Sequence, residues 1–205
     1  MTTHPHLNTL IIGSGASGLA AAVFLHRLGV KDIAIYTEGL QHGTSLNAGS
    51  DKQTYYKLGL YGAEPDAPVL MANDLSAGGA MHGDIALIEA AASPLTFANL
   101  VHLGVPFPHD EFGQYIGYKT DHDPKRRATS CGPYTSREMC LALTAEAKRL
   151  NIPIRENRIA IELLTDRNRC RAIGAIFVNT AKSALAGQCF ETVQAENIIF
   201  ATGGP

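Results

Sequence analysis

The feature that most constrains the fold lies near the start of the sequence. Residues 10–22 read LIIGSGASGLAAA, an apolar run followed by a G-x-G-x-x-G pattern and an alanine-rich segment. Gly13 permits a tight turn from strand to helix, Gly15 lets a pyrophosphate approach the backbone, and Gly18 lets the helix and strand pack closely. The unpaired N–H groups and positive dipole end of such a helix favour an anion.

A second apolar run and an acidic residue strengthen this interpretation. Residues 33–36 read IAIY, and Glu38 lies about 20 residues after Gly18, where an acid can bind a ribose 2′-hydroxyl. A glycine turn in an ordinary β-α-β unit is the alternative explanation. The succession of strand, turn, helix and acid favours a binding site for an adenine dinucleotide.

Length and composition bound the remaining possibilities. The 205 residues suit one large domain or a domain and a half, and 45% hydrophobic residues can form a substantial core. A net charge of −2 argues against nucleic-acid binding through bulk electrostatics. The four cysteines show no C-x-x-C spacing, so neither a metal site nor a disulfide framework is expected. Without a recognisable signal peptide or membrane segment, we expect a cytoplasmic protein.

The middle of the chain predicts a loop, helices and short strands. Residues 39–61 contain a small, glycine-rich polar run that is typical of a loop. Residues 66–103 predict three helical stretches, the second capped by Asp84 and the third beginning after Pro94. Residues 105–133, which are rich in proline, glycine and aromatics, predict short strands and irregular structure.

The last third of the chain predicts one helix and three strands. Residues 135–138 read TSRE and open a helix that runs to about Leu150. Apolar runs follow at residues 159–164, 172–178 and 197–201, separated by polar turns, which indicates a β-meander.

Four local patterns resemble the flavoprotein family of succinate dehydrogenase, fumarate reductase and L-aspartate oxidase. The first is GSGASG at 13–18 with Glu38, and the second is the small-residue loop GTSLNAGS at 43–50. The third is Arg126-Arg127 followed by GPYTSR at 132–137, and the fourth is the closing strand IIFATGG at 198–204. They occur in the family's order along the whole chain.

The resemblance implies an α/β fold: a Rossmann-like FAD-binding domain with a parallel sheet and a β-meander. It divides the chain into a dinucleotide motif (8–38), a loop and helical insertion (39–133), and a helix, meander and closing strand (134–205). It implies an FAD-dependent oxidoreductase that transfers a hydride between FAD and a small carboxylate of the succinate/fumarate or amino-acid type. An electron-transfer partner subunit is possible in this family.

The resemblance also assigns candidate residues. Those expected to bind the cofactor are Gly13, Ser14, Gly15, Ser17, Gly18, Glu38, Thr44, Ser45, Ala48, Gly49, Thr202, Gly203 and Gly204. His122, Arg126 and Arg127 are candidates for substrate contact, because arginines can grip a carboxylate in bidentate fashion. A solvated loop with local ion pairs explains the same residues equally well. The catalytic acid and base are expected outside this chain.

Two departures from the family pattern limit what can be carried over. Relatives with covalent flavin have a histidine where Gly43 stands here, and His42 comes one position early, so noncovalent FAD is expected. The family's later capping and flavin-binding segments do not follow, so we expect an N-terminal portion that is inactive alone. Two alternatives stay open: a non-catalytic FAD-binding module or electron-transfer subunit, and an NAD(P)-dependent reductase.

Overall fold

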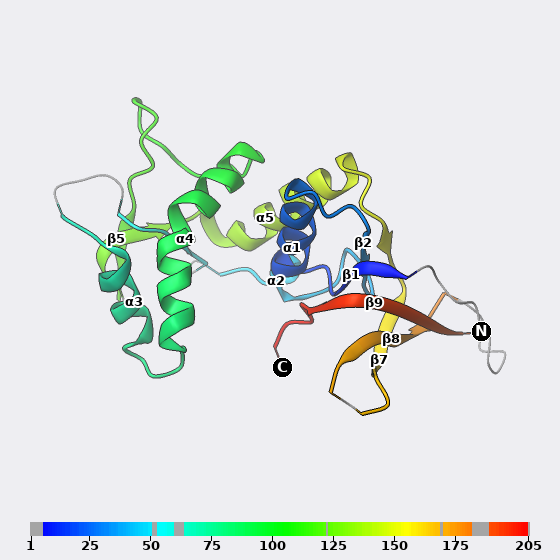
Figure 1. Ribbon diagram of the computed structural model, residues 1–205. Coiled ribbons are helices and arrows are strands. Elements are labelled where there is room, and N and C mark those ends of the chain that lie inside the picture. Colours follow the sequence, from blue (N-terminus) through cyan, green and yellow to red (C-terminus); the bar gives the residue numbers. More distant parts are fainter. Residues whose placement is uncertain are drawn as a thin grey trace. The chain divides into compact units, whose positions relative to one another are not determined.

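The computed structural model describes residues 6–50, 53–59, 64–121, 123–168, 170–181 and 189–204 (Figure 1). The chain divides into two compact units. Unit 1 comprises residues 1–48 and 143–205, and unit 2 comprises residues 49–142. The helix α5 (Thr135–Arg149) contributes residues to both, and it confirms the helix predicted from Thr135.

Unit 1 is built on a six-stranded sheet of order β6-β2-β1-β9-β8-β7. The strands are β1 (Leu7–Ile12), β2 (Ile33–Tyr36), β6 (Ile154–Arg155), β7 (Arg158–Thr165), β8 (Ala172–Asn179) and β9 (Phe190–Phe200). The strands β6, β2, β1 and β9 run parallel, whereas β7, β8 and β9 form an antiparallel meander. The predicted α/β class with a parallel sheet and a β-meander is confirmed.

The strand β9 links the two halves of this sheet. Its first half pairs antiparallel with β8, and its second half pairs parallel with β1. The sequence predicted a strand only from Asn197, but the strand begins at Phe190. Its first half alternates buried and more exposed residues, and the buried set includes Glu191, which pairs with Arg158 at 2.9 Å. Because the buried set includes the carboxylate of Glu191, the first half of β9 contains no continuous apolar run that would predict a strand.

The register aligns the carboxyl ends of three parallel strands. Ile12 of β1 lies opposite Tyr36 of β2 and Phe200 of β9. The residues that follow these strands therefore meet at one edge of the sheet, which is where ligands bind in open α/β sheets. The helix α1 (Ala16–Arg27) follows β1, buries Leu19, Ala22 and Val23, and ends before Gly29, whose φ is +99°.

Unit 2 combines a three-stranded sheet with a helical pair. The sheet has the order β3-β5-β4 and is antiparallel, with β3 (Tyr55–Tyr56), β4 (Tyr118–Thr120) and β5 (Asp123–Thr129). The helices α3 (Pro68–Ser76) and α4 (Gly83–His102) pack together through a buried cluster of small and apolar side chains. A short 3₁₀ helix, η1 (Gly132–Tyr134), leads into α5.

The helix α4 corrects the predicted break at Pro94. One continuous helix contains that proline, and its N-cap is His82 rather than Asp84, since the Asp84 N–H donates to Nδ1 of His82 at 3.3 Å. Proline lacks the N–H that would bind the carbonyl four residues earlier, here that of Ala90. The Ser93 hydroxyl donates to this carbonyl at 2.9 Å. The neighbouring serine thus replaces the bond that the proline removes.

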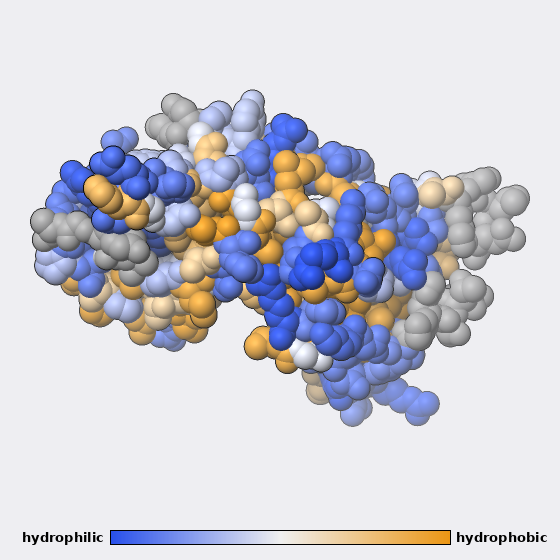
Figure 2. Space-filling model, turned by 90° about the horizontal axis from the view of Figure 1, so that it is seen from above, coloured by the Kyte–Doolittle hydropathy of each residue, from blue (hydrophilic) through white to orange (hydrophobic). Residues whose placement is uncertain are grey.

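Within the described residues, α4 is the one helix long and apolar enough to cross a membrane by length and composition. Its Ala86, Ala90 and Phe97 side chains are buried, whereas Ile88 and Leu95 are 67% and 69% exposed. Figure 2 shows apolar surface interspersed with hydrophilic surface on the molecule. The helix therefore packs through one face and exposes apolar side chains elsewhere.

Candidate functional site

Gly13 occupies the junction of the three aligned strands in unit 1. Its N–H donates to the Tyr36 carbonyl at 2.9 Å, and the Ala201 N–H donates to the carbonyl of Ile12 at 2.8 Å. Gly13 has a φ of +107°, and a Cβ added there would lie 2.3 Å from the Ala201 carbonyl oxygen. Both the backbone conformation and the close approach of β9 therefore require glycine.

The other two glycines of the motif have different roles. Gly15 is the N-cap of α1 and offers no side chain to the first-turn N–H groups, and that turn holds no acidic residue. A Cβ on Gly15 would meet only Ser45, at 3.3 Å from its hydroxyl oxygen, whereas a Cβ on Gly18 would lie 2.2 Å from the Gly13 carbonyl oxygen. Gly18 thus permits close packing, and Gly15 leaves the helix N-terminus accessible to an anion.

The two serines of the motif also differ. Ser14 is buried, and its hydroxyl lies 2.8 Å from that of Thr37 at the end of β2. Ser17, in the first turn of α1, is exposed. The Ser14 hydroxyl therefore ties the turn after β1 to the end of β2, while the Ser17 hydroxyl faces solvent.

Glu38 is held by its backbone and exposes its carboxylate. The Asn157 N–H donates to the Glu38 carbonyl at 3.0 Å, and the Arg158 N–H donates to the Thr37 carbonyl at 2.9 Å. The side chain of Glu38 is 61% exposed, and its Oε1 lies 3.7 Å from Nδ1 of His42. The carboxylate at the end of β2 is thus available to a hydroxyl-bearing ligand.

These groups line one cleft of about 300 Å³ in unit 1. The predicted cofactor residues in its wall are Gly13, Ser14, Gly15, Ser17, Glu38, Thr44, Ser45, Thr202 and Gly203. Thr44 and Ser45 lie on a one-turn helix, α2 (Thr44–Asn47), inside the segment predicted to be a loop. The structure thus brings together nine residues from three separate parts of the sequence.

Four predicted cofactor residues lie elsewhere. Gly18 packs beneath the turn, and neither Ala48 nor Gly204 is in the wall of the cleft. Gly49 belongs to unit 2, where an added Cβ would lie 2.7 Å from Cε1 of Tyr134. In this structure Gly49 therefore allows close packing against an aromatic ring.

The cleft also contains residues that the sequence did not indicate. They include Tyr36 and Gly39 near the end of β2, and Arg158, Ile159 and Ala160 at the start of β7. The β7 residues are about 140 positions from the glycine motif, and no sequence motif marks them. Only the position of β7 in the fold reveals them.

Arg127, a candidate for substrate contact, is the centre of a buried ion cluster in unit 2. Its side chain is 1% exposed, and it binds Asp66 through Nε at 2.8 Å and through the second terminal nitrogen at 2.7 Å. The remaining terminal nitrogen binds Asp74 at 2.6 Å and Asp123 at 2.9 Å. All three nitrogens of this guanidinium bind the chain's own carboxylates, so its geometry is that of a structural residue.

The other two substrate-contact candidates remain predictions. Arg126 is exposed on β5, beside Arg127 in the sequence. His122 lies outside the described residues. Within the described part of the chain, no group of three or more histidine, cysteine or acidic side chains is arranged to hold a metal ion.

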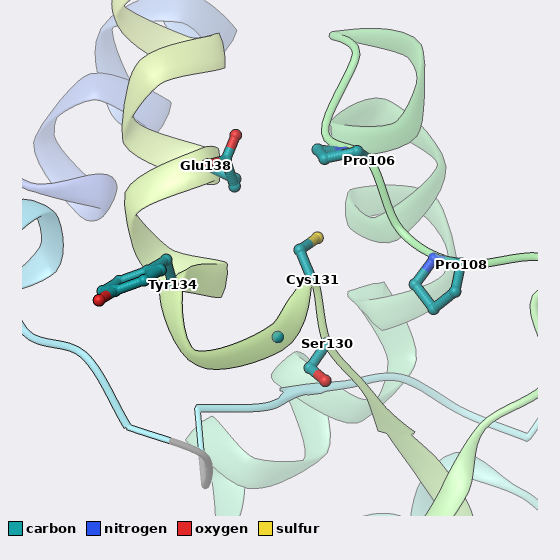
Figure 3. A pocket seen from close by; sticks show the side chains of 7 residues that line it. Pro106, Pro108, Ser130, Cys131, Tyr134 and Glu138 are labelled. Atoms are coloured by element: carbon teal, nitrogen blue, oxygen red, sulfur yellow. The ribbon is translucent and has the colours of Figure 1, made fainter.

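Unit 2 contains a cavity of about 570 Å³, separate from the cleft of unit 1, and Cys131 lines it. Figure 3 shows its thiol among the labelled side chains, between Glu138 of α5 on one side and Pro106 and Pro108 on the other. Burial, together with the Glu138 carboxylate, raises the pKa of the Cys131 thiol to about 11. Because the thiolate is the nucleophilic form, the structure does not favour Cys131 as a reactive group near neutral pH.

Comparison with known proteins places this fold in a family. The family described as "FAD binding domain" matches residues 8–205. The chain belongs to the FAD-binding domain family. L-aspartate oxidase of Pseudomonas aeruginosa is 27% identical over 222 residues, which cover all of this chain and 38% of that protein. The FAD-binding domain thus spans well under half the length of this relative.

Solved structures share the fold of this FAD-binding domain. E. coli quinol fumarate reductase matches with a TM-score of 0.78 and 19% identity, over all of this chain and 33% of that one. The 3-ketosteroid-Δ4-(5α)-dehydrogenase of Rhodococcus jostii matches with a TM-score of 0.76 and 17% identity, over 99% of this chain and 47% of that one. The predicted resemblance to the fumarate reductase and L-aspartate oxidase flavoproteins is confirmed.

Proposed function

We propose that this FAD-binding domain serves an oxidoreductase that transfers a hydride between FAD and a small carboxylate. The observation that carries the proposal is the cleft of unit 1, which is lined by both the uncapped N-terminus of α1 and the exposed Glu38. The first is suited to a pyrophosphate and the second to a ribose hydroxyl. Bound FAD would supply the redox chemistry, and the chain would supply binding and orientation.

The lining residues divide the cleft into regions with different tasks. Gly15 and the first turn of α1 would hold the pyrophosphate, and Glu38 the adenosine ribose. The apolar surface of Ile159 and Ala160 would lie against the adenine. Thr44 and Ser45 would lie toward the flavin, and Thr202 and Gly203 on the cofactor's other flank.

The FAD in this proposal is noncovalent. The family resemblance puts Gly43 where covalent relatives have the flavin-linking histidine. His42 lies beside Glu38, on the proposed ribose side of the cleft. Acid precipitation of the FAD-loaded protein should release free FAD into the supernatant. Flavin that stays with the precipitate in the wild type but not in His42→Ala would instead identify His42 as an attachment site.

The substrate class rests on the relatives. L-aspartate oxidase and quinol fumarate reductase are named for small carboxylated molecules, which supports a substrate of the succinate/fumarate or amino-acid type. An electron-transfer partner subunit and a cytoplasmic location belong to the same proposal. The structural neighbours also include a 3-ketosteroid dehydrogenase, so a 3-ketosteroid is the competing substrate class.

Titration of purified chain with FAD, NADH and NADPH tests the cofactor assignment. Quenching of flavin fluorescence should report FAD binding that neither nicotinamide nucleotide displaces. Glu38→Ala should weaken the binding at least about tenfold, since a hydrogen bond to a charged group contributes about 1.5–3 kcal/mol. Displacement of FAD by equimolar NADPH would refute the flavin assignment in favour of an NAD(P)-dependent reductase.

A separate experiment tests the substrate class. FAD bound to the longest reading frame that contains this chain is mixed anaerobically with succinate or L-aspartate, and absorbance of the oxidised flavin is followed. Bleaching by either compound, with none by a 3-ketosteroid, is the expected result. Bleaching by the steroid alone would refute the carboxylate proposal while leaving the FAD assignment intact.

A further inference from the structure

The segment that follows β2 carries Glu38 and is held by the turn between β6 and β7, which belongs to the same unit. The Thr37 N–H donates to the Arg155 carbonyl at 3.0 Å, and the Thr37 carbonyl accepts from the Arg158 N–H at 2.9 Å. The Asn157 N–H donates to the Glu38 carbonyl at 3.0 Å. Three backbone bonds therefore fix where the main chain of Glu38 lies.

Glu156 adds a side-chain bond to the same segment. Its Oε2 accepts a hydrogen bond at 2.9 Å from the Leu40 N–H, two residues after Glu38. A bond from a backbone N–H to a carboxylate is charge-assisted and roughly twice as strong as a neutral one. The turn between β6 and β7 thus holds the chain on both sides of Glu38, at Thr37 and at Leu40.

Asn157 gives this turn its shape. Its φ is +60°, in the left-handed region that asparagine adopts more readily than most residues other than glycine. Its N–H donates to the Glu38 carbonyl, and its own carbonyl accepts from the Thr180 N–H at 3.0 Å, just past the end of β8. The turn that holds Glu38 is therefore itself tied to the meander.

The Glu38 carboxylate depends on its backbone for its position. Its side chain is mostly exposed, and its ion-pair partner within the described residues is His42, at 3.7 Å. That separation is too long for a hydrogen bond, so no such bond from the described part of the chain fixes the carboxylate. A hydrogen bond to a ribose hydroxyl weakens when its length or angle changes. The main chain around Glu38 therefore sets how well the carboxylate reaches a ribose.

We propose that Glu156 and Asn157 are positioning residues for recognition of the adenosine ribose. The inference rests on the proposed function, in which Glu38 binds that ribose. Neither positioning residue belongs to the described wall of the cleft, whereas Glu38 does. They act by holding the segment after β2 where the Glu38 carboxylate meets the ribose 2′-hydroxyl. Without the Glu156 carboxylate, the Leu40 N–H would turn to water and the segment would shift.

Recognition of this one hydroxyl is measured with two ligands, FAD and an FAD analogue built on 2′-deoxyadenosine. Each is titrated into the full chain, and quenching of flavin fluorescence gives its dissociation constant. The ratio of the analogue's constant to that of FAD isolates the 2′-hydroxyl, because a loss of stability or a change of net charge affects both ligands alike. We expect a ratio of about ten in the wild type and about one in Glu38→Ala.

Three variants test the role of Glu156. Glu156→Ala should lower the ratio to about two or three, because the Glu38 carboxylate loses its alignment with the hydroxyl. Glu156→Gln removes the same charge but keeps an acceptor oxygen for the Leu40 N–H, so it should restore most of the wild-type ratio. Glu162→Ala, which removes an exposed acid from β7, should leave the ratio unchanged.

Two variants test the role of Asn157. Asn157→Gly adopts a φ of +60° without strain and should keep the wild-type ratio. Asn157→Val is strained in that conformation and should lower the ratio. If Asn157→Val fails to fold, the comparison of Glu156→Ala with Glu156→Gln still decides the proposal.

The outcomes separate this proposal from the one on which it rests. A ratio that is the same in the wild type and in Glu38→Ala would refute the ribose role of Glu38, and the positioning roles with it. A ratio that falls in Glu38→Ala but not in Glu156→Ala would overturn the positioning role and leave the FAD assignment intact. An equal fall in Glu156→Ala and Glu156→Gln would also overturn it, since charge alone would then explain the effect.

Discussion

The two units of the molecule organise polar groups in opposite ways. In unit 1 the candidate site is made largely of backbone: glycines at the strand ends, an uncapped helix N-terminus and a single exposed carboxylate. In unit 2 the polar centre is made of side chains, with one buried arginine held by three aspartates. The glycine motif of unit 1 is contiguous in the sequence, whereas two of the three aspartates in unit 2 lie 61 and 53 residues from Arg127 and meet it only in the fold.

The strongest test of the backbone-built site is Gly13→Ala. The new methyl group would lie 2.3 Å from the Ala201 carbonyl oxygen, and the residue would have to adopt a φ of +107°. We expect a loss of about 3 kcal/mol or more in the free energy of unfolding, together with loss of FAD binding. Urea denaturation and flavin fluorescence measure the two effects.

Gly29→Ala is the matched control for this prediction. Gly29 has a similar φ of +99°, but no atom of the described residues lies within 4 Å of an added Cβ. This variant should lose only about 1–2 kcal/mol, the cost of a left-handed conformation, and should keep its FAD affinity. If the two variants are equally stable, the close approach of β9 to Gly13 is not important.

The corresponding test in unit 2 is Arg127→Met. Removing the guanidinium leaves up to three acids together with no counter-charge, and breaking a buried pair in this way costs about 3–5 kcal/mol. Arg126→Met, at the exposed neighbouring position, should change stability by less than about 0.5 kcal/mol. The two variants are compared by urea denaturation at neutral pH. Equal stability would show that the ion cluster does not stabilise unit 2.

The pH dependence of stability gives a finer test of the same cluster. The folded-state pKa of Asp66, about 2, lies below the ordinary value of 3.8. A carboxylate with a lowered pKa stabilises the fold above its unfolded pKa, and this contribution is lost as the pH falls through the folded value. The free energy of unfolding of Asp66→Asn should therefore be about 2 kcal/mol lower than that of the wild type at pH 7 and at pH 5.

This difference between Asp66→Asn and the wild type should narrow between about pH 4 and pH 2, because the wild-type carboxylate then becomes protonated. Glu64→Gln is the exposed comparison, since the Glu64 side chain is 48% exposed and pairs with Lys119 at the surface. The free energy of unfolding of Glu64→Gln should differ little from that of the wild type at every pH. A difference for Asp66→Asn that stays constant down to pH 2 would contradict the assigned ion pair.

The sequence predicted much of unit 1 because its signals are local. The turn at Gly13, the helix after it and Glu38 lie within one short segment, and each matches a feature expected of a dinucleotide site. The start of β7 was missed because Ile159 and Ala160 reach the cleft only through the sheet order. They are ordinary strand residues that carry no chemical signature.

Unit 2 was harder to predict for the same reason. Arg127 was identified as a candidate for substrate contact because sequence shows its charge but not its partners. Asp66 and Asp74 lie 61 and 53 residues earlier, in segments with no recognised pattern. The break predicted at Pro94 failed because the hydroxyl of Ser93 takes over the carbonyl of Ala90, a compensation that helix propensity does not include.

The smallest effects are expected for the two serines of the glycine motif, one on stability and the other on FAD affinity. Ser14→Ala removes the hydroxyl that lies 2.8 Å from Thr37, so it should cost about 1 kcal/mol of stability and change FAD affinity less than about twofold. Ser17→Ala removes an exposed hydroxyl in the wall of the cleft, so it should leave stability unchanged and weaken FAD binding about threefold. Urea denaturation measures the stability of each variant, and FAD titration measures its affinity. The opposite assignment, with Ser14 affecting affinity and Ser17 stability, would show that the Ser14 hydroxyl turns from Thr37 to the cofactor when FAD binds.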